Sequence, residues 1–170
     1  MPGLVKSLAD IALLRGDPSV LPSSWASVAL FVLAYAVADV VVASTGSIQP
    51  ILARTAVDLA LTLPFFWLLL ALTRRTHRFP QTVNAALGVY VLLAPVIILL
   101  LLLRNPARTN QALSLLVTAS FTVFMIWYLL IVGHILRSAL DTGLVTGFAI
   151  AVTWLVVTVA ISRSLFGAAT

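Results

Sequence analysis

The stretch NAALGVYVLLAPVIILLLLL, from Asn84 to Leu103, contains no charged side chain. A helix needs about 20 mostly apolar residues to cross the hydrocarbon core of a bilayer, and this stretch has that length. Four further apolar stretches of similar length flank it, at residues 24–44, 51–73, 112–136 and 144–162. The sequence therefore predicts an all-α fold, a polytopic integral membrane helix bundle with five transmembrane helices.

The overall composition agrees with this fold class. Hydrophobic residues make up 62% of the chain and charged residues 9%, whereas charged residues reach about 25% in soluble proteins. The segments between the apolar stretches are too short to form a hydrophobic core of their own. We therefore expect a single membrane domain that spans residues 1–170, in contact with the lipid bilayer.

The N-terminal segment has a different pattern. Apolar residues recur at helical spacing over residues 4–15, Lys6 and Asp10 fall on the other side, and Gly16 and Pro18 end the pattern. Such a helix lies along a membrane surface with its apolar face toward the acyl chains. We expect a short amphipathic interfacial helix here. The alternative is a poorly ordered terminus.

The distribution of basic residues predicts the topology. The chain has ten Lys and Arg against five acidic residues, and the densest basic cluster, Arg74, Arg75 and Arg78, lies between the second and third apolar stretches. Connections rich in Arg and Lys stay in the cytoplasm. The N-terminus is then cytoplasmic and the C-terminus lies outside. Because the basic residues gather at helix ends, they indicate topology and not nucleic-acid binding.

Ionisable residues also lie inside the first two apolar stretches. Asp39 precedes the end of the first, and Arg54 and Asp58 follow the start of the second. In a helical hairpin the three reach the same depth, about 7–10 Å below the outer hydrocarbon boundary at 1.5 Å per residue. Tyr35 and Thr62 each lie one helical turn away and can add hydrogen bonds.

This candidate intramembrane cluster needs compensation, because a carboxylate at the bilayer centre costs about 2.5–3.5 kcal/mol. Arg54 can offset one aspartate. The other must be protonated, hydrated by a cavity, or paired with a group such as Arg108. Two interpretations remain open: a structural clamp that holds the first hairpin together, and a polar pocket or proton-binding site.

A second polar pattern lies on the fourth apolar stretch. Gln111, Ser114, Thr118 and Thr122 form a stripe on one face of the predicted helix. If the stripe points at the first two helices, it completes an outward-opening polar cavity with the aspartates. Alternatively, the hydroxyl groups bond to their own helix or to a neighbouring one.

The inner end of the same helix carries His134, Arg137 and Asp141 on one face. One histidine and one acid do not make a metal site. Opposite the basic connection, they form a candidate docking surface for anionic lipid or a protein partner at the inner rim. Its residues are Arg74, Arg75, Arg78, His134, Arg137 and Asp141.

No catalytic motif is present, and the chain contains neither glutamate nor cysteine, so we predict a protein that is not an enzyme and has no cofactor or metal. One function class is a scaffold or accessory subunit of a membrane assembly, which pairs with itself or with a membrane-protein partner through small residues. The other is a small transporter or a proton- or ion-conducting oligomer that uses Asp39, Arg54 and Asp58. The small residues are Gly147, Ala149, Ala151 and Ala160.

Two short segments carry a resemblance to a known family. Leu14-Arg15-Gly16-Asp17-Pro18 follows the N-terminal helix, and Gly133-His134-Ile135-Leu136-Arg137-Ser138-Ala139-Leu140 ends the fourth apolar stretch. With the five-span layout, these segments resemble bacterial members of the Yip-domain group of small membrane proteins. The resemblance implies a non-enzymatic, multi-pass protein of the bacterial inner membrane, and it carries over no functional residue.

Overall fold

The computed structural model describes residues 2–46, 50–107 and 110–167. Within them the chain is helical and contains no strand. Five of its helices are long and apolar enough to cross a membrane, which confirms the predicted all-α class. The elements are α1 (Pro2–Ala12), η1 (Pro18–Val20), α2 (Trp25–Thr45), α3 (Ile51–Leu72), η2 (Thr76–Arg78), α4 (Phe79–Ala107), α5 (Gln111–Leu140) and α6 (Leu144–Phe166).

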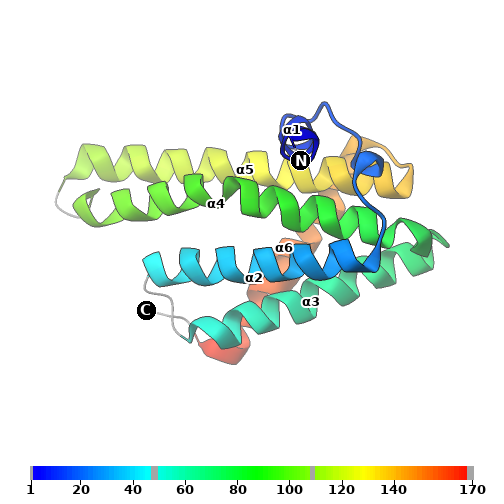
Figure 1. The fold of residues 1–170 in the computed structure, drawn as a ribbon. Coiled ribbons are helices and arrows are strands. Elements are labelled where there is room, and N and C mark those ends of the chain that lie inside the picture. The colour runs from blue at the N-terminus through cyan, green and yellow to red at the C-terminus, as the bar shows by residue number, and fades with distance from the viewer. Residues whose placement is uncertain (1, 47–49, 108–109, 168–170) are drawn as a thin grey trace.

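The five long helices pack into one bundle (Figure 1), in which their contacts form a ring and α3 also contacts α4 across it. Going round it, α2 packs against α4, α4 against α5, α5 against α6, α6 against α3, and α3 again against α2. α3 follows α2 directly in the chain, but α2 packs most extensively on α4. Residues from all five helices can therefore meet on one central axis.

The two ends of this ring differ in chemistry. At one end lie η2 and the connection between α5 and α6, with Arg75, Arg78 and Asp141; we call this the basic end. At the other end α2 and α6 finish and α3 begins; we call it the C-terminal end. Toward the basic end, the fully buried side chains of Phe66, Leu70, Ile131, Ile135 and Leu136 belong to the apolar core.

The helix bounds match the predicted apolar stretches for α2 and α3, whereas α4 and α5 are longer. η2 leads directly into α4, so α4 begins at Phe79, before the apolar stretch. α5 starts where the Asn110 side chain accepts a hydrogen bond from the Leu113 backbone N–H, and it ends where Asp141 takes a left-handed conformation with φ 49°. Local capping, and not hydropathy, sets these ends.

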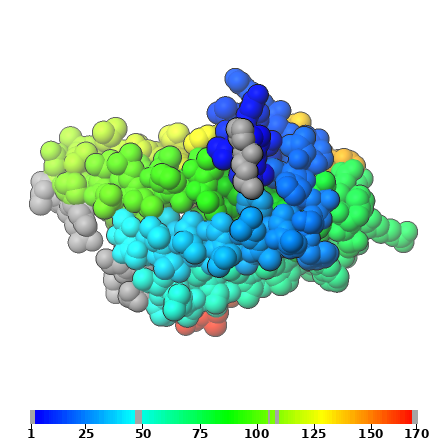
Figure 2. Space-filling model, viewed as in Figure 1, coloured from blue at the N-terminus to red at the C-terminus, as the bar shows by residue number. Residues whose placement is uncertain are grey.

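α1 is helical as predicted, but its apolar face is buried by protein. Leu8, Ile11 and Ala12 are at most 6% exposed, because α1 crosses α4 and α5 and packs on both (Figures 1 and 2). A Cβ at Gly88 of α4 would lie 2.8 Å from Leu8 Cδ2, so this glycine allows the close approach. The bundle itself thus supplies the apolar partner of this face, and the interfacial position of α1 stays a prediction.

The contact between α5 and α6 also depends on glycine. A Cβ at Gly147 would lie 2.2 Å from the Gly133 carbonyl oxygen, and a Cβ at Gly133 would lie 2.8 Å from Phe148 Cα. Gly147 and Ala151 are buried inside the bundle, so they were wrongly predicted to contact a partner. Ala149 and Ala160 remain exposed on α6.

Candidate functional site

A pocket with a volume of about 280 Å³ lies between the five spanning helices and holds both aspartates of the predicted cluster. Each of the five spanning helices contributes to its lining, which extends to the C-terminal end, where Ala43, Arg54 and Ser162 lie near helix ends. We call it the aspartate pocket. Its lining residues are Tyr35, Asp39, Ala43, Arg54, Asp58, Tyr90, Tyr128, Trp154 and Ser162.

Hydroxyl groups from three helices hold the two carboxylates. Tyr90 on α4 donates to Asp39 Oδ1 over 2.7 Å, and Thr55 on α3 donates to Asp39 Oδ2. Tyr35 on α2 donates to Asp58 Oδ2. Both oxygens of Asp39 are therefore engaged, whereas Asp58 Oδ1 accepts no hydrogen bond from a described residue. Asp58 keeps one carboxylate oxygen available to a ligand.

The structure brings Arg54 to the same pocket as Asp39 and Asp58. Its guanidinium carbon lies 4.8 Å from the centre of the Phe166 ring on α6, a cation–π contact. The offset of one aspartate charge by Arg54 stays a prediction, and Arg108, the other suggested partner, lies outside the described residues.

A smaller cavity of about 10 Å³ lies deeper than the aspartate pocket. Tyr35, Tyr128 and Trp154 line both spaces. The Thr62 Oγ1 and Trp154 Nε1 atoms are buried there without a hydrogen-bond partner among the described residues, so the expected hydrogen bond from Thr62 to the cluster is absent. Phe66, Leu87 and Val132 form its remaining apolar wall. The polar lining of the two spaces thus ends at these packed apolar side chains.

Sequence reasoning missed three of the residues that complete this site. Thr55 and Tyr90 hold Asp39, and Tyr128 lines the pocket from α5. Thr55 follows Arg54 directly and shares a helical turn with Asp58, so its position was a usable signal. Tyr90 and Tyr128 gave no such signal, because single tyrosines are common in apolar helices and their faces depend on helix packing.

The polar stripe of α5 does not join the aspartate pocket. Gln111, Ser114, Thr118 and Thr122 are all exposed, and Thr122 Oγ1 donates to the carbonyl of Thr118 in its own helix over 3.0 Å. Thr118 and Thr122 line a separate groove of about 250 Å³ between α4 and α5. The predicted shared cavity was therefore wrong, since the stripe faces outward from the ring.

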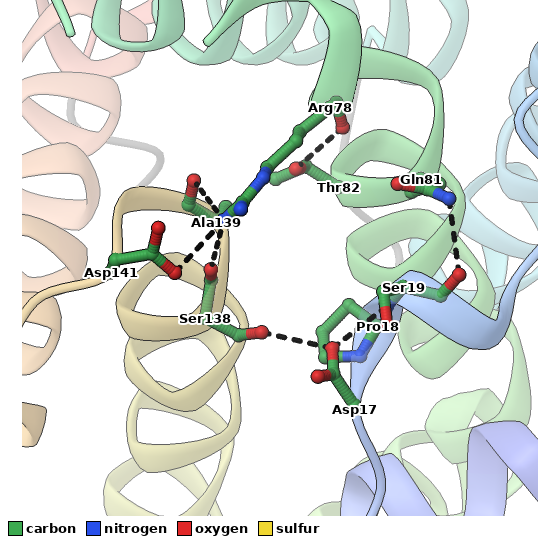
Figure 3. Close-up of a pocket in the computed structure, with 9 residues that line it drawn as sticks. All are labelled: Asp17, Pro18, Ser19, Arg78, Gln81, Thr82, Ser138, Ala139 and Asp141. Carbon is green, nitrogen blue, oxygen red and sulfur yellow. Dashed lines mark hydrogen bonds and ion pairs between the residues drawn. The ribbon is translucent and has the colours of Figure 1, made fainter.

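At the basic end, Arg75 and Arg78 bind the C-terminal end of α5, and Figure 3 shows the contacts of Arg78. Arg78 donates to the carbonyl of Ser138 over 2.9 Å and to Asp141 over 3.0 Å, and Arg75 also pairs with Asp141. The Arg78 hydrogen bond keeps the pKa of Asp141 below its ordinary value, and Arg75 adds to this effect. These two arginines are thus engaged within the bundle, whereas Arg74 and Arg137 are exposed.

The segment between α1 and α2, residues 13–24, is bound to the same end; we call it the N-terminal strap. His134 Nε2 lies 2.8 Å from the Gly16 carbonyl, and Ser138 Oγ donates to Asp17 over 2.9 Å (Figure 3). Farther along, Gln81 donates to the Ser19 carbonyl over 3.0 Å. His134 is buried at 7% exposure, so it was wrongly assigned to a docking surface: it anchors the strap.

The strap should loosen in acid. The backbone N–H of Ser19 and the Ser138 hydroxyl hold the pKa of Asp17 below its ordinary value of 3.8. A depressed pKa in the folded state means that the ionised form is stabilised, so this contribution is present above pH 3.8 and is lost as the pH falls through the folded pKa. We expect the backbone amides of residues 13–24 to lose hydrogen-exchange protection when the pH is lowered below 3.8. In the Asp17→Asn variant these amides should be weakly protected at every pH. If their protection depends on pH as in the wild type, Asp17 is not the group responsible.

Comparison with known proteins adds no relative. No protein-family model, no curated protein and no solved structure matches the chain significantly. The resemblance to the Yip-domain group therefore stays a prediction based on residues 14–18 and 133–140. These two segments do contact each other, through the pairs Gly16 with His134 and Asp17 with Ser138.

Proposed function

We propose that this integral membrane protein is not an enzyme and that it binds a cation in the aspartate pocket, entering from the C-terminal end. The observation that carries the proposal is the convergence of Asp39 and Asp58 on one open pocket lined by all five spanning helices. Intramembrane carboxylates that face a cavity commonly mark the path of an ion or substrate.

The charge of the pocket favours a cation. With both carboxylates ionised, the guanidinium of Arg54 leaves one net negative charge among the lining residues. Asp39 accepts two hydrogen bonds from hydroxyl groups and Asp58 accepts one. These bonds favour the ionised form, whereas burial and the closeness of the two carboxylates favour the protonated form. A surrounding of low polarity strengthens the attraction between this charge and a cation.

A small transporter is the class of protein that this arrangement fits best. The pocket is reached from one end, and the opposite side is filled by Phe66, Leu70 and Ile135. Transport then requires a second conformation in which the core at the basic end opens. The closed ring provides helix contacts that could change in such a step, since α3 and α6 share only a modest contact in this state.

A scaffold or accessory subunit remains the second candidate, and the Asp39 contacts favour it. Asp39 on α2 accepts hydrogen bonds from Thr55 on α3 and Tyr90 on α4, so the carboxylate joins three helices. Interhelical hydrogen bonds of this kind contribute about 0.6 kcal/mol each in membranes. In that role the aspartates are structural, and a partner or a second copy would bind the exposed faces of the helices.

The positive-inside rule supports an orientation in which the basic end faces the cytoplasm, in a bacterial inner membrane if the family resemblance holds. The aspartate pocket then opens to the outside. At the basic end, the exposed side chains of Arg74 and Arg137 suit contact with anionic lipid headgroups, each worth about 1 kcal/mol near such a surface.

The proposal predicts cation-dependent stabilisation. A cation that binds only the folded protein raises the protein's thermal unfolding midpoint as the cation concentration increases. The measurement is the unfolding midpoint of purified protein in mild detergent, titrated with K⁺, Mg²⁺ and tetraalkylammonium chlorides at constant ionic strength. Asp58→Asn should weaken binding at least tenfold, because Asp58 has the available carboxylate oxygen. Asp10→Asn on α1 is the matched control and should bind as the wild type does. If no cation stabilises the wild type, the scaffold becomes the better proposal.

A further inference from the structure

We infer that the ligand of the aspartate pocket is an organic ammonium ion, and not a metal ion; the inference rests on the proposed function and specifies its ligand class. Four aromatic side chains line the pocket beside the carboxylates: Tyr35, Tyr90, Tyr128 and Trp154. Carboxylates surrounded by aromatic rings attract organic cations, because the ring faces carry negative electrostatic potential and the rings also contact alkyl groups.

Three of these rings, Tyr35 on α2, Tyr90 on α4 and Tyr128 on α5, lie next to one another and form a wall. The ring centres of Tyr35 and Tyr90 lie 4.6 Å apart, and those of Tyr90 and Tyr128 lie 6.5 Å apart. The hydroxyls of Tyr35 and Tyr90 are bound to the aspartates, so the positions of these two rings are fixed before a ligand arrives. Fixed walls reduce the entropy cost of binding.

The pocket offers four carboxylate oxygens, from Asp39 and Asp58, fewer than a hard metal ion usually takes. Ca²⁺ takes six to eight oxygen ligands, and Mg²⁺ demands six in an octahedron. Each oxygen of Asp39 already accepts one hydrogen bond and Asp58 Oδ2 accepts another, so Asp58 Oδ1 is the carboxylate oxygen with no hydrogen bond from a described residue. In the described part of the chain, no group of three His, Cys, Asp or Glu side chains could hold a metal.

An ammonium ion needs only one such oxygen. Its charge would lie at Asp58 Oδ1, and its carbon substituents would contact Tyr128 and Trp154, which continue the wall into the deeper cavity. The Tyr128 hydroxyl forms no hydrogen bond with another described residue and can bind a polar group of the ligand. A pocket of about 280 Å³ lies at the lower end of the range for small-molecule sites, so the ligand is small.

The test separates ring from hydroxyl contributions at Tyr128. Tetramethylammonium and tetraethylammonium chloride are titrated calorimetrically into the full-length protein in detergent, with K⁺ and Mg²⁺ as inorganic probes. Wild-type protein should bind a tetraalkylammonium ion in preference to both. Tyr128→Phe keeps the aromatic face and should change that affinity less than threefold, whereas Tyr128→Leu should weaken it about tenfold. Trp154→Phe and Trp154→Leu repeat the comparison if Tyr128→Leu does not fold.

The outcomes distinguish this inference from the proposed function. If K⁺ or Mg²⁺ binds in an Asp58-dependent way and tetraalkylammonium ions do not, the pocket is a cation site but the inference on ligand class is overturned. Equal affinities for the Phe and Leu variants would also overturn it, because the aromatic face would then contribute nothing. If no cation of either class binds, the proposed function fails as well.

Discussion

Replacing Gly147 by alanine is expected to destabilise the protein by about 3 kcal/mol, at the upper end of the range for overpacked cores. The new Cβ would lie 2.2 Å from the Gly133 carbonyl oxygen and 3.0 Å from the Arg137 backbone nitrogen. Both contacts involve the backbone of α5, so no side-chain rotation can relieve them. α5 and α6 must separate, and their contact is the most extensive one between two helices of the ring.

The measurement is thermal unfolding of the purified variant in detergent, followed by circular dichroism. Gly143→Ala is a matched control, because a Cβ at Gly143 meets nothing within 4 Å and its φ of −71° suits alanine. The control should stay within about 0.5 kcal/mol of wild type. If the two variants unfold alike, the close approach of α5 and α6 at Gly147 is not required for stability.

Phe66→Ala is the second change with a large expected effect, a loss of about 3–4 kcal/mol. Phe66 on α3 is 1% exposed, and its ring lies 6.3 Å from that of Trp154 on α6. It also lines the small cavity below the aspartate pocket. Truncation removes packing contacts in the layer that closes the pocket toward the basic end, and it leaves a cavity there.

The neighbouring residue supplies the control for this change. Trp67 is 53% exposed and points away from the core, so Trp67→Ala should cost less than about 1 kcal/mol by the same unfolding assay. In sealed vesicles, Phe66→Ala should also leak small cations more than wild type does, because it opens the apolar layer. A Phe66→Ala variant as stable as Trp67→Ala would show that this layer does not hold the ring together.

The number and approximate bounds of the membrane-spanning helices were predictable from the sequence. An apolar run of about 20 residues has few alternatives to a spanning helix, because lipid cannot satisfy the backbone hydrogen bonds of any open structure. The bounds of α2 and α3 follow from this rule. The extra length of α4 and α5 did not, because η2 and Asp141 set their ends through local backbone conformation.

The candidate site was predictable only in part. Asp39, Arg54 and Asp58 stand out because charged residues are costly in apolar runs, and the hairpin places them at one depth. Their partners did not stand out: Asp39 binds Tyr90, which is 51 residues away in the chain. The aromatic wall that gives the pocket its character therefore could not be found from spacing along one helix.

The sequence by itself determined that the chain embeds in a membrane, how many times it can cross, and where charges enter the apolar zone, since these depend on the free energy of transferring each residue into lipid. The tertiary structure decided which faces meet. The helices contact one another in the order α2, α4, α5, α6 and α3, and α1 is buried against them. The polar stripe of α5 faces outward, and three tyrosines and a tryptophan line the pocket with the aspartates. The physical reason is that lipid and protein are equally apolar, so hydrophobicity does not select a packing face; close fits such as Gly147 against Gly133 do.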